Sequence, residues 1–306
     1  MTSTKVIWAC ALVSVAMLAA QAGASQPVVY YSGDQLGGTV SDESGNGNHG
    51  TVFGGVELSD DGYVGKSLAF NGSDAYLELQ RPVQDDFAIT AWIKTDATAP
   101  GGSHAYQGNG LFWADVEGTD NDLVIGVLGT KLSFFGGNPD TSVNSNGDIV
   151  TGEWVHIAAV RNIEARTLSV YINGQLDNNV SYSNTAPLDA QSIMVVGANT
   201  LDGRFYEGLM DEIRMYGRFL TNEQVAELYD GILPSWPKAE APDPADGAVG
   251  VTAPLLQWTP GEGAMFHDVY HAGTDRNRTR RHPTIVHHVL PHRRLPIGGH
   301  VLLARR

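Results

Sequence analysis

Residues 167–178 read TLSVYINGQLDN, and this short stretch predicts a complete β-hairpin. The aliphatic residues at 168, 170 and 172 alternate with Thr167, Ser169 and Tyr171, as they do in a strand with one buried side. Asn173-Gly174 follows at once, and this dipeptide is the strongest short-range signal for a tight turn between antiparallel strands. A hairpin in the middle of the chain favours an antiparallel β fold.

The same signals repeat on both sides of this hairpin. Strands are predicted at residues 87–94, 154–160, 193–196 and 209–216, and in the first of these Phe87, Ile89, Ala91 and Ile93 share one side. The one convincing helix covers residues 222–229, where Thr221 is the N-cap and Gln224 completes a capping box. Many short strands and a single late helix predict an all-β sandwich with one short C-terminal helix.

The first 24 residues have the pattern of a signal peptide. Lys5 precedes an apolar run at 6–20, and Ala22-Gly23-Ala24 then gives the small-x-small pattern of a cleavage site. The single cysteine, Cys10, lies inside this segment, so we expect no disulfide in the mature chain. We expect a secreted or cell-surface protein without a membrane span after signal removal; the alternative is a retained N-terminal anchor.

Charge is distributed unevenly along the chain. Residues 25–274 hold 33 of the 34 acidic residues and 10 Lys or Arg, which gives a net charge of 10 − 33 = −23. Residues 275–306 hold eight Arg and one Asp, a net charge of 8 − 1 = +7. The acidic body argues against nucleic acid as a partner and suits an extracellular protein that uses divalent cations.

Several blocks of the sequence resemble one family. Residues 41–51, SDESGNGNHGT, resemble the opening of laminin-G-like jelly rolls in the concanavalin A-like lectin/glucanase superfamily. Later blocks follow in that family's order, and the last of them resembles its closing helix; they lie at residues 65–72, 87–94, 152–156, 171–174, 208–216 and 220–225. The resemblance implies an antiparallel jelly-roll β-sandwich over residues 25–231.

The remainder of the chain has a different character. Residues 232–244 contain four prolines and predict a stiff linker, and residues 245–274 resemble the first strands of an immunoglobulin-like or fibronectin type III-like sandwich that is truncated. Residues 275–306 form a basic His/Arg tail without a strand pattern. Three hypotheses explain this tail: it is a basic arm that binds polyanions, its histidines bind a metal, or the natural reading frame was lost near residue 274. We favour the lost frame, because the composition changes abruptly, and we then expect further domains in the intact protein.

The residues also suggest a calcium site. We predict that Asp211 shares the core-facing side of its strand with Leu209, Ile213 and Met215, so its carboxylate needs a cation or several hydrogen-bond donors. The loop at residues 42–48 offers hard oxygen ligands at alternate positions, which suit Ca²⁺. The resemblance implies a structural calcium between such a loop and the late strand. The candidate ligands are Asp42, Asn46, Asn48 and Asp211. An Asx-rich turn, with Asp211 bonded to backbone amides, is the alternative.

The sequence assigns no catalytic residue. Asp115 and Glu117 share a strand side, as a glycosidase carboxylate pair would, but the acidic strand that marks laminarinase-type relatives is absent. His156 is expected to be structural. Aromatic rings and polar groups could bind a sugar, and core packing is the alternative for each ring. The candidate ligand-binding residues are Trp92, Trp113, Asp115 and Tyr171. Further candidates are Tyr106, Asn109 and Asp122.

The leading hypothesis is a secreted, non-catalytic binding module for extracellular polysaccharide or glycoprotein, stabilised by Ca²⁺. A glycan-active hydrolase or lyase on the same fold is one alternative, and a structural or adhesive spacer of a larger surface protein is another. An exposed row of aromatic side chains on one sheet would favour sugar binding. A flat polar face would favour the spacer.

Overall fold

A computed structural model describes residues 26–118, 120–234, 240–243, 257–259, 267–271 and 284–289. The predicted signal peptide, residues 1–24, lies outside the described residues. The chain divides into two units, Ser25–Ser235 and a second unit that contains Trp236–Arg306. The first unit holds both large sheets and the one α-helix of the described residues.

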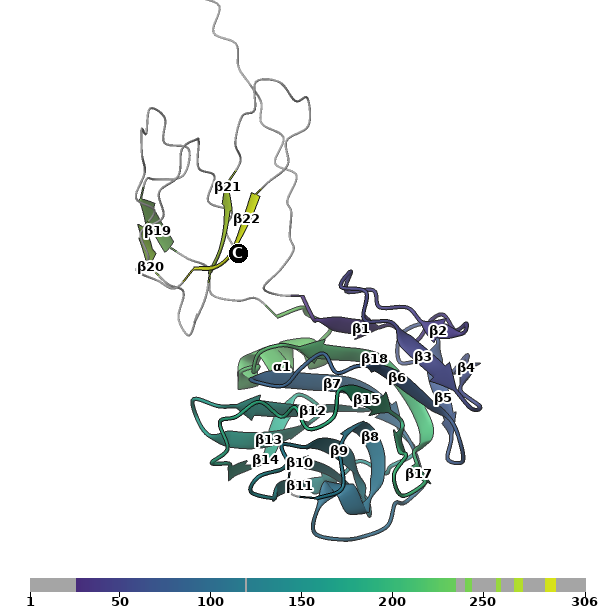
Figure 1. Ribbon diagram of the computed structural model, residues 1–306. Helices are drawn as coiled ribbons and strands as arrows, with labels where there is room; N and C mark the ends of the chain where they lie inside the picture. The colour runs from purple at the N-terminus through teal and green to yellow at the C-terminus, as the bar shows by residue number, and fades with distance from the viewer. Residues whose placement is uncertain are drawn as a thin grey trace, which may run out of the picture. The chain divides into compact units, whose positions relative to one another are not determined.

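Two antiparallel sheets form the first unit (Figure 1). The strands of the first sheet are β1 (Val29–Tyr31), β4 (Glu57–Ser59), β5 (Ser67–Asn71), β7 (Phe87–Lys94), β12 (Val155–Asn162), β13 (Thr167–Ile172), β14 (Gln175–Ser181) and β18 (Glu207–Tyr216). The strands of the second sheet are β2 (Thr39–Val40), β3 (Gly50–Phe53), β6 (Tyr76–Gln80), β8 (Asn109–Ala114), β9 (Leu123–Leu128), β10 (Lys131–Gly136), β11 (Thr141–Asp148) and β15 (Ile193–Val196).

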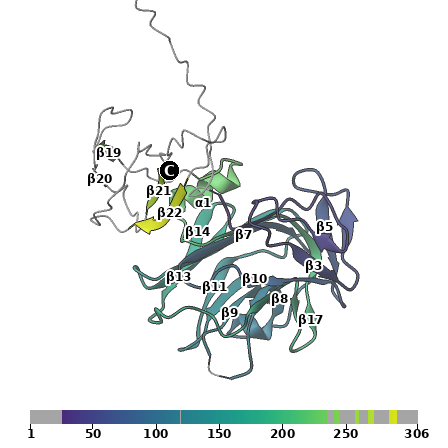
Figure 2. The same cartoon turned by 45° about the horizontal axis from the view of Figure 1, so that its top comes forward.

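The strand order is that of a sandwich with long crossovers. The first sheet runs β14-β13-β12-β7-β18-β5-β4, with β1 paired to β18, and the second runs β11-β10-β9-β8-β15-β6-β3-β2. Strand β15 therefore lies between β8 and β6, far from both in sequence. Figure 2 shows the two layers, with β7, β13 and β14 in one and β8, β9, β10 and β11 in the other. The predicted all-β jelly-roll sandwich is confirmed.

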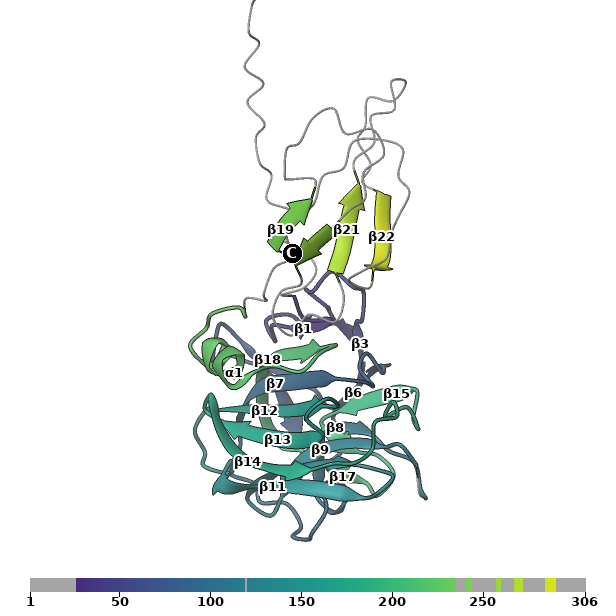
Figure 3. The ribbon, with the colours of Figure 1, turned by 90° about the vertical axis from the view of Figure 1, so that its left-hand side faces the viewer.

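Shorter elements cover the outer sides of both sheets. Helix α1 (Asn222–Tyr229) begins at the predicted N-cap Thr221, whose side chain accepts the Gln224 N–H in a capping box, and it lies beside the first sheet (Figure 3). The 3₁₀ turn η1 (Ala105–Gln107) and the hairpin β16 (Ala198–Asn199) and β17 (Arg204–Phe205) lie against the second sheet. Among the described residues, no helix is long and apolar enough to span a membrane.

The second unit contributes two strand pairs. β19 (Glu240–Asp243) pairs with β20 (Gln257–Thr259), and β21 (His267–His271) pairs with β22 (Thr284–Val289). β20 and β21 fall inside the segment that resembles an immunoglobulin-like or fibronectin type III-like sandwich, and that assignment stays a prediction. β22 lies in the basic tail, where the sequence predicted no strand.

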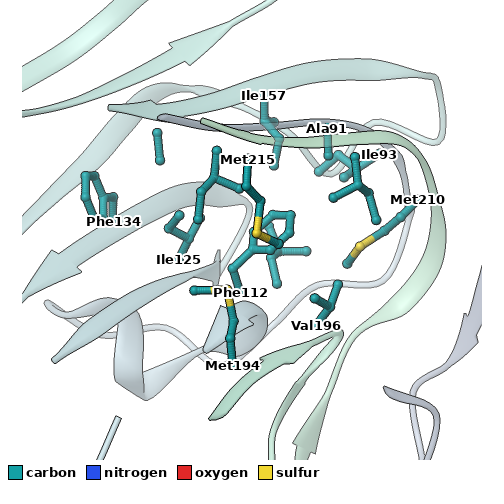
Figure 4. Packing of buried hydrophobic residues seen from close by; sticks show 14 of the residues in the cluster. Ala91, Ile93, Phe112, Ile125, Phe134, Ile157, Met194, Val196, Met210 and Met215 are labelled. Atoms are coloured by element: carbon teal, nitrogen blue, oxygen red, sulfur yellow. The ribbon is translucent and has the colours of Figure 1, made fainter. Parts of the chain in front are cut away.

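The core lies between the two sheets, and it is filled by the side chains that point inward at every second position of each strand. Met210 and Met215 of β18 and Ile157 of β12 meet Ile125 of β9 and Met194 of β15 in one cluster of buried side chains (Figure 4). These side chains are almost completely excluded from water. At about 25 cal/mol per Å² of apolar area, this burial is the main favourable term in folding.

A β-bulge in β18 overturns one sequence prediction. Met210 is paired with Ile93 and lies in the core, whereas Asp211 is paired with Trp92, on the outer side. The register shifts between Asp211 and Arg214, where Glu212 adopts φ +53°, and Ile213 then returns to the core. The prediction that Asp211 faces the core was wrong, because an extra residue in the strand breaks simple alternation.

Arg161 joins two connections between the sheets. Its guanidinium Nη1 donates to the carbonyl oxygens of Gln84 and Asp85 (2.7 and 2.9 Å), and Nη2 donates to those of Asn184 and Ala186 (3.0 and 2.7 Å). The side chain is 1% exposed. It therefore fixes the chain before β7 and the crossover from β14 to β15.

Replacing Arg161 with Met should lower the free energy of unfolding by about 3 kcal/mol, because four carbonyl oxygens lose the donor that the buried guanidinium provides. Urea denaturation monitored by fluorescence measures this change. Arg166→Met, at an exposed position, is the matched control and should change stability by less than about 0.5 kcal/mol. Equal losses in the two variants would contradict the assigned role.

Candidate functional site

The four predicted ligand-binding residues lie on two different surfaces. Trp92 and Tyr171 lie on the outer side of the first sheet, whereas Trp113 lies on the outer side of the second, at the end of the strand that leads to Asp115. Trp92 is 6% exposed, because the ring of Tyr63 stacks on it with centroids 3.5 Å apart and an interplanar angle of 12°. The structure thus does not bring the four residues together.

The outer side of the first sheet is occupied by the protein's own side chains. The Tyr171 hydroxyl donates to Asn222 Oδ1 of α1 (2.9 Å), and the Tyr171 side chain is 4% exposed. His156 is buried beside Trp92, with ring centroids 5.3 Å apart. Burial, followed by the charge of Arg214, lowers the pKa of His156 to about 3, so its ring is neutral at physiological pH. These contacts support packing roles for Trp92, His156 and Tyr171.

The outer side of the second sheet carries a small apolar layer with aromatic rings at its surface. Phe135, Val124, Trp113 and Val195 are paired in one row across β10, β9, β8 and β15, and all four are buried. Four partly exposed rings lie over or beside this layer, and we call them the aromatic face; they are Phe53, Tyr76, Tyr106 and Phe205. Phe53 stacks on Tyr76 with centroids 4.9 Å apart and an interplanar angle of 6°, and Tyr76 lies 6.4 Å from Phe205.

Backbone contacts hold two parts of the aromatic face in place. The carbonyl oxygen of Tyr106 accepts from Arg204 Nη1 (2.9 Å) and from Asn199 Nδ2 (3.3 Å), so η1 is joined to the β16–β17 hairpin. Asn199 also donates to Asp202 Oδ2 (2.9 Å), which pairs with Arg204 at 3.1 Å. These contacts join the turn that carries Tyr106 to the hairpin that carries Phe205.

A pair of carboxyl groups adjoins this face. Asp115 and Asp122 are hydrogen-bonded to each other, and Asp122 Oδ1 also accepts the Val116 N–H at 3.1 Å. Burial, and then the charges of Asp122 and Asp202, raise the pKa of Asp115 to about 7. Two carboxyl groups this close share a proton near neutral pH, so the pair presents both a donor and an acceptor.

The structure pairs Asp115 with Asp122 and leaves Glu117 exposed. Retaining glycosidases hold their two carboxyl groups about 5 Å apart and inverting enzymes hold them farther apart, to leave room for the sugar or for water. The Asp115–Asp122 pair is therefore not the Asp115–Glu117 pair that the glycosidase hypothesis needs.

The predicted calcium ligands fall into two groups. Asp42 accepts three backbone N–H groups, from Tyr30, Ser44 and Asn48 (3.0, 3.0 and 2.9 Å), as an Asx-type turn does. The side-chain amides of Asn46 and Asn48 donate to the Val28 carbonyl (3.3 and 2.8 Å). The first loop thus has hydrogen-bond partners of its own.

Asp211 belongs to the other group. Its carboxylate accepts the N–H groups of Val64 (2.9 Å) and Glu212 (2.8 Å), and burial raises its pKa to about 7. Nearby, Asp34 accepts the Lys66 N–H (2.8 Å), so two carboxylates hold the segment before β5. Within the described part of the chain, no three His, Cys, Asp or Glu side chains are grouped to hold a metal ion. Calcium binding stays a prediction.

Sequence reasoning named Trp113, Asp115, Asp122 and Tyr106 but missed three rings of the aromatic face. Phe53, Tyr76 and Phe205 come from β3, β6 and β17, which only the strand order brings together. One signal was present in the sequence. Tyr76 begins the alternating run YLELQ, on the side opposite Leu77 and Leu79, which lie in the core.

Replacing Asp115 with Asn should raise the midpoint of thermal unfolding by about 2–4 °C at pH 8 and have little effect at pH 4. The native state binds the Asp115 proton more tightly than the unfolded chain does, so the free energy of unfolding falls as pH rises from about 4 to 7. Asn avoids this loss and can still donate to Asp122. Asp120→Asn, an exposed change in the same loop, is the control. The assignment would be contradicted if the midpoint of Asp115→Asn minus that of wild type were smaller at pH 8 than at pH 4.

Comparison with solved structures shows the same fold in binding domains. Domain 4 of AbnA, an extracellular GH43 arabinanase from Geobacillus stearothermophilus solved with arabinotriose, is similar over 67% of this chain and 98% of that one, with a TM-score of 0.55 and 23% identity. The binding domain of Paraclostridial Mosquitocidal Protein 1 covers 86% of this chain and 68% of its own, with a TM-score of 0.53 and 14% identity. The botulinum neurotoxin serotype G binding domain covers 85% and 70%, with a TM-score of 0.53 and 13% identity.

No curated protein sequence matches the chain. A family model does match it: the laminin G model described as the concanavalin A-like lectin/glucanases superfamily aligns with residues 71–226. This match covers half of the chain and runs from the end of β5 into α1. The sequence blocks, the two antiparallel sheets and this alignment agree, and the chain belongs to the concanavalin A-like lectin/glucanases superfamily.

Proposed function

We propose that the protein is a non-catalytic glycan-binding module that uses the outer side of its second sheet. The observation that carries this proposal is the aromatic face, four partly exposed rings beside a hydrogen-bonded carboxyl pair. A row of exposed rings on one sheet is the feature that separates sugar binding from a spacer role. We also propose that the module is secreted, in keeping with the signal-peptide pattern of residues 1–24.

Aromatic rings and sugar rings suit each other physically. The apolar C–H side of a pyranose or furanose ring stacks on an aromatic face, and this contact removes apolar area from water on both partners. Phe53 and Tyr76 are stacked within 6° of parallel, and Phe205 lies beside them. Because Phe53 and Tyr76 stack on each other, a chain of sugars running from β3 to β17 would contact the parts of these rings that remain exposed.

The polar groups needed for sugar hydroxyls lie at the same surface. The Asp115–Asp122 pair supplies a donor and an acceptor, and Asp202 and Arg204 lie on the hairpin that carries Phe205. Beneath this surface, the indole N–H of Trp113 is buried and has no hydrogen-bond partner within the described residues. Such a mixture of ring faces and bidirectional hydrogen-bonding groups is typical of sites that orient a polar ligand on an apolar floor.

The comparisons support this proposal without assigning the ligand. Domain 4 of AbnA was solved with arabinotriose, and other similar structures are binding domains of toxins. The low identity limits the likeness to the fold. The glycan class must therefore come from the chemistry of this surface and from experiment.

Tyr76→Ala and Phe205→Ala should each weaken glycan binding about tenfold or more, because each change removes a stacking surface worth about 1.4 kcal/mol or more. The protein is first tested for retention on a panel of insoluble and gel-embedded polysaccharides, with reducing ends assayed afterwards. Affinities for the retained polymer are then measured by affinity electrophoresis. Near-ultraviolet circular dichroism checks that each variant is folded.

Tyr63→Ala is the control, since Tyr63 is an aromatic residue that is 42% exposed and lies over the outer side of the first sheet. Its affinity should equal that of the wild type. Loss of binding only in Tyr63→Ala would move the site to the first sheet. Absence of retention on every polymer would favour the spacer role, and new reducing ends would establish a hydrolase or lyase.

We further propose that Ca²⁺ stabilises the fold through the region of Asp211. Added Ca²⁺ at about 100 times its Kd should raise the midpoint of thermal unfolding by about 5 °C or more relative to chelator, since binding then adds about 2.7 kcal/mol. Asp211→Ala should abolish this shift. If Ca²⁺ does not shift the midpoint of wild type, the backbone N–H donors are enough to stabilise the carboxylates of Asp42 and Asp211 without a cation. If Ca²⁺ shifts the midpoint of Asp211→Ala as much as that of wild type, Asp211 is excluded as a ligand.

A further inference from the structure

One row of paired residues crosses all eight strands of the second sheet. Its centre is the buried apolar layer across β10, β9, β8 and β15. At one end the row continues to Ser142 of β11. At the other end it continues through Glu78 of β6 and Thr51 of β3 to Thr39 of β2. These polar residues neighbour inward-pointing residues in their strands, so they lie on the outer side, at both ends of the apolar layer.

A fifth ring, that of His104, extends the aromatic face to the β11 end of this row. His104 Nδ1 lies 3.1 Å from the hydroxyl of Ser142. The His104 ring is partly exposed and stacks on Tyr106, with centroids 5.1 Å apart and an interplanar angle of 9°. Both rings meet Phe135 of β10 edge-on, at 5.9 and 5.1 Å. His104 and Tyr106 therefore form a pair of rings held over β10 and β11, which we call the first ring pair.

The other three rings of the aromatic face lie at the opposite end of the row, and we call them the second ring group. Phe53 of β3 and Tyr76 of β6 are partners in the strand pairing and stack on each other, and Phe205 lies 6.4 Å from Tyr76. Strands β9, β8 and β15 separate this group from the first ring pair. The sheet thus presents two sets of rings with a gap of three strands between them.

The spacing of the strands sets the length of ligand that can contact both sets of rings. From β11 to β3 the sheet has seven strands and hence 7 − 1 = 6 spacings. At about 4.8 Å per spacing, the rings extend over about 29 Å. One sugar residue of an extended chain is about as long as one strand spacing. A disaccharide or trisaccharide can therefore contact one set of rings, whereas about six residues are needed to contact both.

The β2 end of the row is exposed. The side chains of Thr51 and Thr39 are both exposed there, so a chain that lies on the row can continue past the edge of the sheet. A site that recognises a terminal sugar needs side chains that stop the chain beyond it. An exposed row with rings near both ends suits the middle of a long chain instead.

We propose that the aromatic face, extended by His104, binds an internal stretch of about six residues of an extended glycan chain, which lies across the strands of the second sheet. This inference rests on the proposed glycan-binding function and defines the form of its ligand. Once one set of rings has bound the chain, contact with the other set is intramolecular, so affinity increases with chain length until both are engaged.

The test uses a ladder of oligosaccharides from two to about eight residues, made by partial acid hydrolysis of the polysaccharide that the protein retains, with arabinan, xylan and β-glucan in the panel. Isothermal titration calorimetry measures the affinity for each length. The six-residue oligosaccharide should bind about tenfold or more tightly than the three-residue one, and longer ones should gain little. His104→Ala should reduce this ratio several-fold, because a single set of rings gains nothing from a longer chain. His104→Phe, which keeps a ring beside Tyr106, should restore the ratio.

Leu176→Ala is the control, since Leu176 is 41% exposed on β14 of the other sheet, and it should leave the ratio unchanged. Equal affinities for three and six residues, or an unchanged ratio in His104→Ala, would overturn the inference. Retention of the polymer together with equal affinities would show that the protein binds chain ends or short segments, and would leave the proposed function intact. Failure to retain any polymer would overturn both.

Discussion

Burial of one side of every central strand between the two sheets is the constraint on which this structure depends. Met210, Met215 and Ile157 from one sheet and Ile125 and Met194 from the other fill that space almost without exposure to water. The inner sides of the sheets are thus committed to stability. A ligand must therefore bind to an outer side of the sandwich, to its loops or to both. The two outer sides differ in which side chains cover them.

On the outer side of the first sheet, Trp92 and Tyr171 are covered by other side chains of the protein. Tyr63 stacks on Trp92 and α1 contacts Tyr171, while Tyr63 itself stays exposed. On the second sheet, the η1 turn and the β16–β17 hairpin bury Trp113 and Phe135 but leave the rings above them partly exposed. The same surface holds a carboxyl group whose pKa is raised by burial, and such a group lowers stability at neutral pH. Because an unfavourable group and partly exposed rings lie together here, this surface is the one on which we place the proposed function.

Local patterns predicted the strands well, because a residue's side of a strand depends on its nearest neighbours. The hairpin at Asn173-Gly174, the core-facing side of β7 and the capping box of α1 are all as the sequence indicated. Asp211 was placed on the wrong side because a bulge at Glu212 adds one residue to the strand, and alternation contains no sign of it. The aromatic face was largely missed for a different reason. Its rings belong to strands and loops far apart in sequence, and only the insertion of β15 between β8 and β6 brings them onto one surface.

Asp115 and Asp122 bear on the two functions that a composition of aromatic and acidic residues permits, glycan binding and glycoside cleavage. Glycoside cleavage needs two carboxyl groups with space between them, one to donate a proton and the other to attack or to activate water. Here burial is the largest cause of the raised pKa of each of the two groups, and each group also affects the ionisation of the other. The Asp115–Glu117 pair that the glycosidase hypothesis needs is not the pair that the structure forms, since Glu117 is exposed. A carboxyl group with a pKa of about 7 can donate as well as accept, and the proposed glycan-binding function uses this property.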